Sequence, residues 1–190
     1  MTDLLPMSAL GSRELLMEAH GDLTIREVTD VALASVAISR DVALPQPFGL
    51  MLPGPGSHVS QGGISAVWTG QRQWMIAAAG EAETDFAARL YAEVPVAAVT
   101  EQTDGWVVLD VESSAGDAAI HHLLERLVNI DPRSFGPGSA TRTGLEHMGV
   151  IVVRSAANRV AIWGMRSAAG TLWHAVSVAA RRLAGPATAD

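Results

Sequence analysis

The tetrapeptide Gly-Pro-Gly-Ser occurs twice in this chain, at residues 54–57 and again at residues 136–139. Each copy is followed by two short strand-like runs, a turn between them, and then a stretch with helical spacing. The aligned segments are 64–68 with 150–154, 74–77 with 160–163, and 82–90 with 168–176. A repeated order of elements predicts two similar halves. The alternative is two unrelated hairpins, because Gly-Pro pairs are common in turns of any protein.

A helix is predicted immediately before the second copy of the tetrapeptide. Ile120, Leu123 and Leu127 recur at helical spacing and form one apolar face, which we expect to point inward. Asp131 is followed by a proline, and proline disfavours a helical conformation in the residue before it. The sequence therefore predicts that this helix ends at residue 131.

The order of hairpins and amphipathic helices predicts an α+β fold in one domain, residues 28–185. Its two pseudo-repeated β-hairpin and helix halves, at about 28–101 and 106–185, are expected to form a mixed sheet with helices on one side. The Asp104-Gly105 step indicates a turn between the halves. Residues 1–27 lack a clean helical stripe and are expected to be an N-terminal arm, either a disordered leader or a segment laid on a partner. Residues 186–190 are expected to be a tail.

Residue usage excludes several kinds of chemistry for this chain acting alone. It has no cysteine, which excludes disulfides, thiolate catalysis, iron-sulfur ligation and zinc sites built on cysteine. It has no lysine, so its 13 basic residues are all arginine and neither a lysine Schiff base nor a P-loop lysine is available. The net charge of −7 argues against a nucleic-acid backbone as the principal partner.

Hydrophobic residues make up 48% of the chain, yet no apolar run reaches the roughly 18 residues that a membrane span requires. The first residues lack both a basic segment and a continuous apolar segment, so no secretory signal is expected and the cytoplasm is the default location. We expect no membrane partner. An apolar share this high indicates that part of the surface faces another protein.

No arrangement of reactive side chains points to a catalytic or metal site. His121 and His122 are adjacent, so on a helix their side chains point about 100° apart and cannot chelate one ion together. Ser57 and His58 stand side by side without an acid to orient the histidine. Neither a G-x-S-x-G nor a dinucleotide-binding glycine motif is present in its required context. The sequence therefore predicts no catalytic, cofactor-binding or metal-binding residue.

Residues 41–63 contain four prolines and five glycines and are predicted to form a long loop. Prolines on both sides keep the backbone extended, so the apolar side chains between them cannot all fold back into a core of their own. We therefore expect a partner interface at four residues of this loop, Phe48, Leu50, Met51 and Leu52.

Four sets of motifs stand out: Trp68-Thr-Gly-x-x-x-Trp74-Met-Ile, Leu127-x-x-x-Asp131-Pro-Arg-Ser-Phe135 with Gly138 and Thr141-Arg-Thr after it, Gly149-Val-Ile-Val-Val-Arg154, and Trp163-x-x-Arg166-Ser with Leu172-Trp173 after it. Together they resemble a known family, the gamma subunit of heterotetrameric sarcosine oxidase. The resemblance covers about residues 23–183 and implies a fold similar to the folate-binding domain of the glycine-cleavage T-protein. The cysteine-bearing signature of the related iron-sulfur repair proteins is absent.

The resemblance implies a non-catalytic structural subunit of a complex that oxidises sarcosine with oxygen. The products would be glycine, hydrogen peroxide, and formaldehyde or 5,10-methylenetetrahydrofolate. It implies alpha, beta and delta subunits as partners, with FAD, FMN, NAD and zinc on those subunits and no cofactor bound by this chain. The alternative is a folate-binding domain that takes part in one-carbon transfer, and a third reading is an independent hydrolase.

Overall fold

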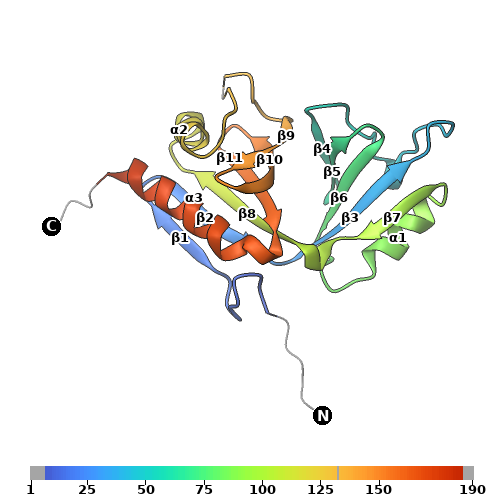
Figure 1. Ribbon diagram of the computed structural model, residues 1–190, viewed down its shortest axis with the longest axis horizontal. Coiled ribbons are helices and arrows are strands. Elements are labelled where there is room, and N and C mark those ends of the chain that lie inside the picture. Colours follow the sequence, from blue (N-terminus) through green and yellow to red (C-terminus); the bar gives the residue numbers. More distant parts are fainter. Residues whose placement is uncertain (1–6, 132, 186–190) are drawn as a thin grey trace, which may run out of the picture.

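The computed structural model describes residues 7–131 and 133–185 and has two β-sheets and three α-helices in those ranges (Figure 1). One sheet contains β1 (Met17–His20), β2 (Leu23–Val28), β8 (Trp106–Ser113), β9 (Ala140–Leu145), β10 (Met148–Ala156) and β11 (Arg159–Met165). The other contains β3 (Val31–Ile38), β4 (His58–Gln61), β5 (Ile64–Gly70), β6 (Gln73–Ala79) and β7 (Ala97–Glu101). The helices are α1 (Phe86–Glu93), α2 (Asp117–Leu127) and α3 (Ala169–Ala184). Three single 3-10 turns are η1 (Pro47–Gly49), η2 (Thr103–Gly105) and η3 (Arg166–Ala168).

The strand order is β1-β2-β8-β11-β10-β9 in the first sheet and β4-β5-β6-β3-β7 in the second. Every strand pair in both sheets is antiparallel. The predicted α+β class is confirmed. Its strands form two separate antiparallel sheets rather than one mixed sheet, because the connections carry the chain from one sheet to the other instead of extending a single sheet.

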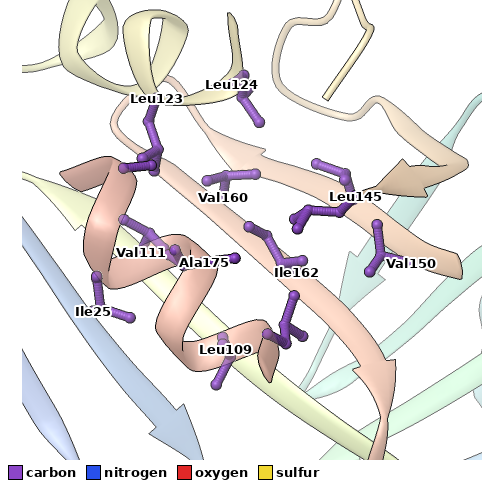
Figure 2. Close-up of a cluster of buried hydrophobic side chains, with 14 of the residues drawn as sticks. Ile25, Leu109, Val111, Leu123, Leu124, Leu145, Val150, Val160, Ile162 and Ala175 are labelled. Carbon is purple, nitrogen blue, oxygen red and sulfur yellow. The ribbon is translucent and has the colours of Figure 1, made fainter. Parts of the chain in front are cut away.

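Three apolar clusters hold the layers together. On the six-stranded sheet, α2 and α3 cover a cluster that includes Ile25, Leu109 and Ile162 (Figure 2). On the five-stranded sheet, α1 contributes Phe86 and Leu90 to a second cluster. The third cluster combines residues of both sheets, which shows that the two sheets pack on each other through their remaining faces: Leu33, Val67, Met75, Ala77, Val108, Ala140, Ile151, Val153 and Trp163. Each sheet thus has helices on one face and the other sheet on its second face.

Helix α2 is shorter than the sequence predicts. It ends at Leu127 instead of residue 131, and Val128 is already extended with φ −142° and ψ 151°. Val128 forms an isolated antiparallel bridge with Leu145 at the end of β9. Pairing with a distant strand therefore ends the helix before the Asp131-proline step is reached.

The predicted repeat is present in the structure down to its irregularities. Strands β5 and β6 form a hairpin with a β-bulge between Trp68 and Gly70. Strands β10 and β11 form a hairpin with a bulge between Arg154 and Ala156, which are the residues that the sequence alignment places over Trp68 and Gly70. A bulge at matching positions is a specific feature of backbone geometry, so the two hairpins are equivalent units.

The N-terminal segment does not form the arm that the sequence predicts. Residues 17–20 and 23–28 are strands β1 and β2, and β2 pairs with β8 as β7 pairs with β3 in the other sheet. The second half therefore takes its equivalent of β7 from the start of the chain. The Asp104-Gly105 turn lies in η2, which joins strands of different sheets. The expected tail, 186–190, lies outside the described residues.

Candidate functional site

The two Gly-Pro-Gly-Ser segments lie against each other. Ser57 and Ser139 form an isolated antiparallel bridge. The backbone N–H of His58 donates to the Gly138 carbonyl at 2.8 Å, and the N–H of Ala140 donates to the Gly56 carbonyl at 2.9 Å. Each of these bonds becomes the other when the halves are exchanged, so a local twofold axis passes between the two segments.

Hydrogen bonds also tie this junction to both sheets. The N–H of Arg154 in β10 donates to the Ser139 carbonyl at 2.8 Å, and the N–H of Gly138 donates to the Arg154 carbonyl at 2.8 Å. In the other half, the N–H of Trp68 donates to the Ser57 carbonyl at 3.3 Å. The contacts are made by the backbone, so the junction positions the halves and does not present a reactive group.

Ser57 and His58 lie in this junction, and their side chains do not form a catalytic pair. The Ser57 hydroxyl donates to the Pro55 carbonyl at 3.5 Å. His58 is half-buried and its Nδ1 has no hydrogen-bond partner in the described part of the chain. Burial lowers the pKa of His58 below its usual value, because desolvation disfavours the protonated ring. Among the described residues no acid orients the ring, and general-base catalysis at a serine requires one.

The other histidines make separate contacts or are exposed, although His121 and His122 are neighbours in α2 and His20 and His122 line the same small pocket. His20 Nε2 is 2.8 Å from a carboxylate oxygen of Glu18, and His121 Nε2 is 3.2 Å from Asp117 Oδ1. Three further histidines are exposed, His122, His147 and His174. In residues 7–131 and 133–185, no group of three metal-ligating side chains is close enough to hold an ion.

The predicted loop 41–63 contains strand β4, and the part of it before β4 folds back onto its own half, so part of the predicted partner interface is wrong. Leu50 and Leu52 are only 4% and 8% exposed and belong to the cluster under α1. The reversal occurs at η1, where Phe48 has a left-handed backbone with φ 54°. Met51 points the other way and is 72% exposed. Of the four predicted residues, Met51 is therefore the one whose side chain remains available to a partner.

Phe48 is held mainly by α1. Its ring stacks on the ring of Phe86 with centroids 6.1 Å apart, and the Arg89 guanidinium lies 4.8 Å from its centre. Its backbone N–H donates to Glu93 Oε2 at 3.1 Å. These contacts favour an internal packing role for Phe48.

The Asp131–Phe135 segment forms a surface loop with a buried anchor. Asp131 Oδ1 accepts hydrogen bonds from the backbone N–H and from Nε of Arg133, both at 3.1 Å. These bonds hold the pKa of Asp131 below its ordinary value. The Arg133 side chain is 88% exposed, whereas Phe135 is buried under α2 and α3. The loop therefore displays a guanidinium next to a carboxylate on a fixed base.

Sequence reasoning missed three buried charged groups, Glu27 of β2, Asp110 of β8 and Arg154 of β10. Asp110 of β8 is 4% exposed and accepts hydrogen bonds from Arg26 Nε at 2.9 Å and from Arg159 Nε at 2.8 Å. Arg154 of β10 is fully buried and donates to the Asp117 carboxylate and to the Ala157 carbonyl. The available signal was a charged residue inside an apolar strand pattern, which predicts a partner but does not identify it.

Comparison with known proteins gives a likeness of fold. Neither a family model nor a curated protein sequence matches the chain. A chain of the heterotetrameric sarcosine oxidase from Corynebacterium sp. U-96 matches with a TM-score of 0.71 and 19% identity, over 90% of this chain and 91% of that chain. The glycine cleavage system aminomethyltransferase T from Bartonella henselae matches with a TM-score of 0.61 and 13% identity, over 85% of this chain and 50% of that chain.

The fold predicted from the sequence motifs is thereby confirmed, since the matching structures are a chain of a heterotetrameric sarcosine oxidase and a glycine cleavage system aminomethyltransferase T. Within the described ranges, none of the helices has the length and apolar character needed to cross a bilayer.

Proposed function

We propose that this chain is a non-catalytic, gamma-type structural subunit of a heterotetrameric sarcosine oxidase. The observation that carries the proposal is the end-to-end likeness to a chain of such an enzyme, over 90% of this chain and 91% of that one. A match that leaves little of either chain uncovered favours the same part in an assembly over a shared fragment. The complex would oxidise sarcosine with oxygen to glycine, hydrogen peroxide, and formaldehyde or 5,10-methylenetetrahydrofolate.

The chemistry of the described residues supports a structural role. The two halves are joined by backbone bonds at the Gly-Pro-Gly-Ser junction, and Ser57 and His58 in that junction lack an orienting acid. In this proposal, alpha, beta and delta subunits are the partners and hold the FAD, FMN, NAD and zinc. The exposed side chains of Met51 and Arg133 are candidate contacts with those partners.

A second candidate is a folate-binding domain that itself takes part in one-carbon transfer. The likeness to aminomethyltransferase T over 85% of this chain favours it. The two candidates differ in one property of the isolated chain. A structural subunit needs no affinity for tetrahydrofolate, whereas a folate domain must bind it without help from other subunits.

Co-expression tests the first candidate. The tagged chain is produced together with the alpha, beta and delta subunits of a heterotetrameric sarcosine oxidase, and the purified material is identified by mass spectrometry. We expect stoichiometric recovery of all four chains and sarcosine-dependent formation of hydrogen peroxide. A monomeric chain that turns over a substrate by itself, or a fully active oxidase assembled without this chain, would overturn the proposal.

Calorimetric titration of the isolated chain with tetrahydrofolate separates the two candidates. The structural role predicts no saturable heat, and a micromolar Kd would promote the folate-binding role. The absorption spectrum of the same sample is a further check. A structural subunit should be colourless, and a stoichiometric flavin spectrum from this chain alone would contradict the assignment of flavins to the other subunits.

A further inference from the structure

A cavity of about 710 Å³ opens where the chain crosses between the two sheets. Both crossings line it: residues 28–31 connect β2 to β3, and residues 103–106 connect β7 to β8. The segment before β1, residues 7–15, forms another wall, near the lower centre of Figure 1. The volume of the cavity lies within the range of small-molecule sites, roughly 300 to 1,000 Å³.

Negative charge predominates in the walls of this cavity. Five carboxylates line it, Glu14, Glu27, Asp30, Glu83 and Asp104. Two guanidiniums line it, those of Arg13 and Arg166. None of the five carboxylates forms a salt bridge with any residue that the structure describes. A concave surface lined by one sign of charge concentrates the opposite sign.

Glu27 is the one buried member of this group, with 2% of its surface exposed. Its Oε1 accepts hydrogen bonds from the backbone N–H groups of Ala9 at 2.7 Å and Leu10 at 3.3 Å. Its Oε2 is buried and has no hydrogen-bond partner among the described residues. A buried carboxylate oxygen without a donor is costly, so this atom calls for a donor that the described chain does not supply.

Part of the remaining wall is apolar and aromatic, and the other part carries serine and threonine side chains. Val31, Leu33, Val107 and the half-buried Trp106 contribute to it. An indole ring attracts an organic cation through its face, and aliphatic side chains favour an apolar stem. A bare metal ion fits poorly, because in the described ranges no three ligating side chains are close enough to hold one.

We propose that this cavity binds a small organic cation, an ammonium group on an apolar stem, with Glu27 as the principal acceptor. The turn at residues 8–12 is bonded to Glu27 Oε1 and Oε2 is buried, so the cation reaches Oε2 only when the residues around this carboxylate move. Binding therefore couples the cavity to the segment before β1. The proposal rests on the residues of this chain and does not depend on the proposed function.

Calorimetry with tryptamine, and with its neutral analogue tryptophol, tests the proposal on the full chain. We expect saturable binding of tryptamine, at least about tenfold tighter than tryptophol, which converts to about 1.4 kcal/mol. The affinity should fall as salt is raised, because the rim carboxylates are exposed and screened. Equal affinity for the two compounds, or no saturable tryptamine binding up to about 5 mM, would overturn the proposal.

Variants locate the site. Glu27→Gln keeps the shape of the side chain and should weaken tryptamine about tenfold, whereas Glu125→Gln on the exposed side of α2 should change nothing. Asp104→Asn, at the exposed rim, gives a second reading if Glu27→Gln impairs folding, and should weaken binding about threefold. If neither cavity variant changes the affinity, the assignment is wrong.

An NMR measurement and a peptide titration complete the test. Amide NMR signals of Ala9 and Leu10 should shift on tryptamine binding, because their N–H groups bond to Glu27. A tri-arginine peptide is titrated in parallel. If that peptide binds more tightly than tryptamine and is weakened by the same variants, the cavity receives a basic segment of another protein, and the small-molecule assignment is overturned.

Discussion

Arg154 and Asp117 form an ion pair in which the arginine is buried and the aspartate is half exposed. Arg154 is fully buried, and its Nε and Nη1 have no partner in the described residues. Burial lowers the pKa of its guanidinium, since desolvation disfavours the charged form. The Asp117 side chain is 52% exposed and keeps much of its hydration. Loss of the partner therefore costs more free energy for the buried arginine than for the hydrated aspartate.

We predict that Asp117→Ala destabilises the chain more than Arg154→Met does. Losing the carboxylate leaves a buried guanidinium with only the Ala157 carbonyl, at a cost of about 2 kcal/mol after allowing for the exposure of Asp117. Arg154→Met removes the buried charge, keeps most of the volume, and should stay within about 1 kcal/mol of the wild type. Urea denaturation measures both. As a control, Asp117→Ala should cost little in the Arg154→Met background, and equal costs in both backgrounds would show that the pair is not coupled.

His58 gives a stability that depends on pH. Its folded-state pKa lies below the ordinary value of 6.5, so on acidification the unfolded chain binds the proton first. The contribution to stability is complete above about pH 6.5 and is lost as the pH falls through the lower folded value. Thermal unfolding between about pH 8 and about pH 5 should show a steeper acid loss in the wild type than in His58→Gln. Parallel curves would mean that His58 titrates normally.

At the scale of elements, the turn η1 directs Leu50 toward α1 and leaves Met51 exposed to solvent. Leu50→Ala should cost about 2 to 5 kcal/mol, because it empties a buried position under α1. Phe48→Ala should cost about 1 to 3 kcal/mol through the lost contact with Phe86. Met51→Ala should leave the unfolding temperature unchanged and is the variant suited to assembly assays. A large loss of stability in Met51→Ala would show that this side chain packs internally.

The Gly-Pro-Gly-Ser segments offer matched glycines for a second test. Gly56 and Gly138 have φ of 72° and 86°, and an added Cβ at either meets nothing within 4 Å. Alanine at either position should therefore lower the free energy of unfolding by about 1 to 2 kcal/mol from backbone strain alone. The two losses should be similar. Gly54→Ala and Gly136→Ala, at positions without positive φ, should cost nothing comparable. Unequal costs at Gly56 and Gly138 would argue against an equivalent role of the two turns.

Elements that depend on local sequence could be predicted, and those that depend on distant partners could not. The hairpins β5–β6 and β10–β11 follow from apolar runs around short turns. Strand β2 also alternates, but Glu27 occupies an inward position and argues against a strand until its bonds to Ala9 and Leu10 are known. The turn at Phe48 could not be predicted from the sequence either, since a non-glycine residue rarely adopts positive φ.

The whole molecule is two equivalent units, and the second unit takes one of its strands, β2, from the start of the chain. We predict that a chain beginning at residue 29 fails to fold, because β2 pairs along β8 and buries Leu23 and Ile25. A synthetic peptide of residues 7–28 should restore the fold in trans, as followed by circular dichroism. The same peptide with Ile25→Asp is the control and should not. A chain from residue 29 with an unchanged unfolding temperature would contradict this account.

The position of β2 at the start of the chain, far in sequence from its partner β8, also has a consequence for the order in which the protein can fold during its synthesis. Strands β3 to β7 and α1 occupy one stretch, 31–101, so that unit can close as soon as the stretch has left the ribosome. Strand β2 emerges first and must wait for β8, and the helix α3 that covers its apolar face arrives last. For most of translation the exposed edge of β2 is thus open to wrong pairing. We therefore expect a chaperone to be needed first at β2, near the start of the nascent chain.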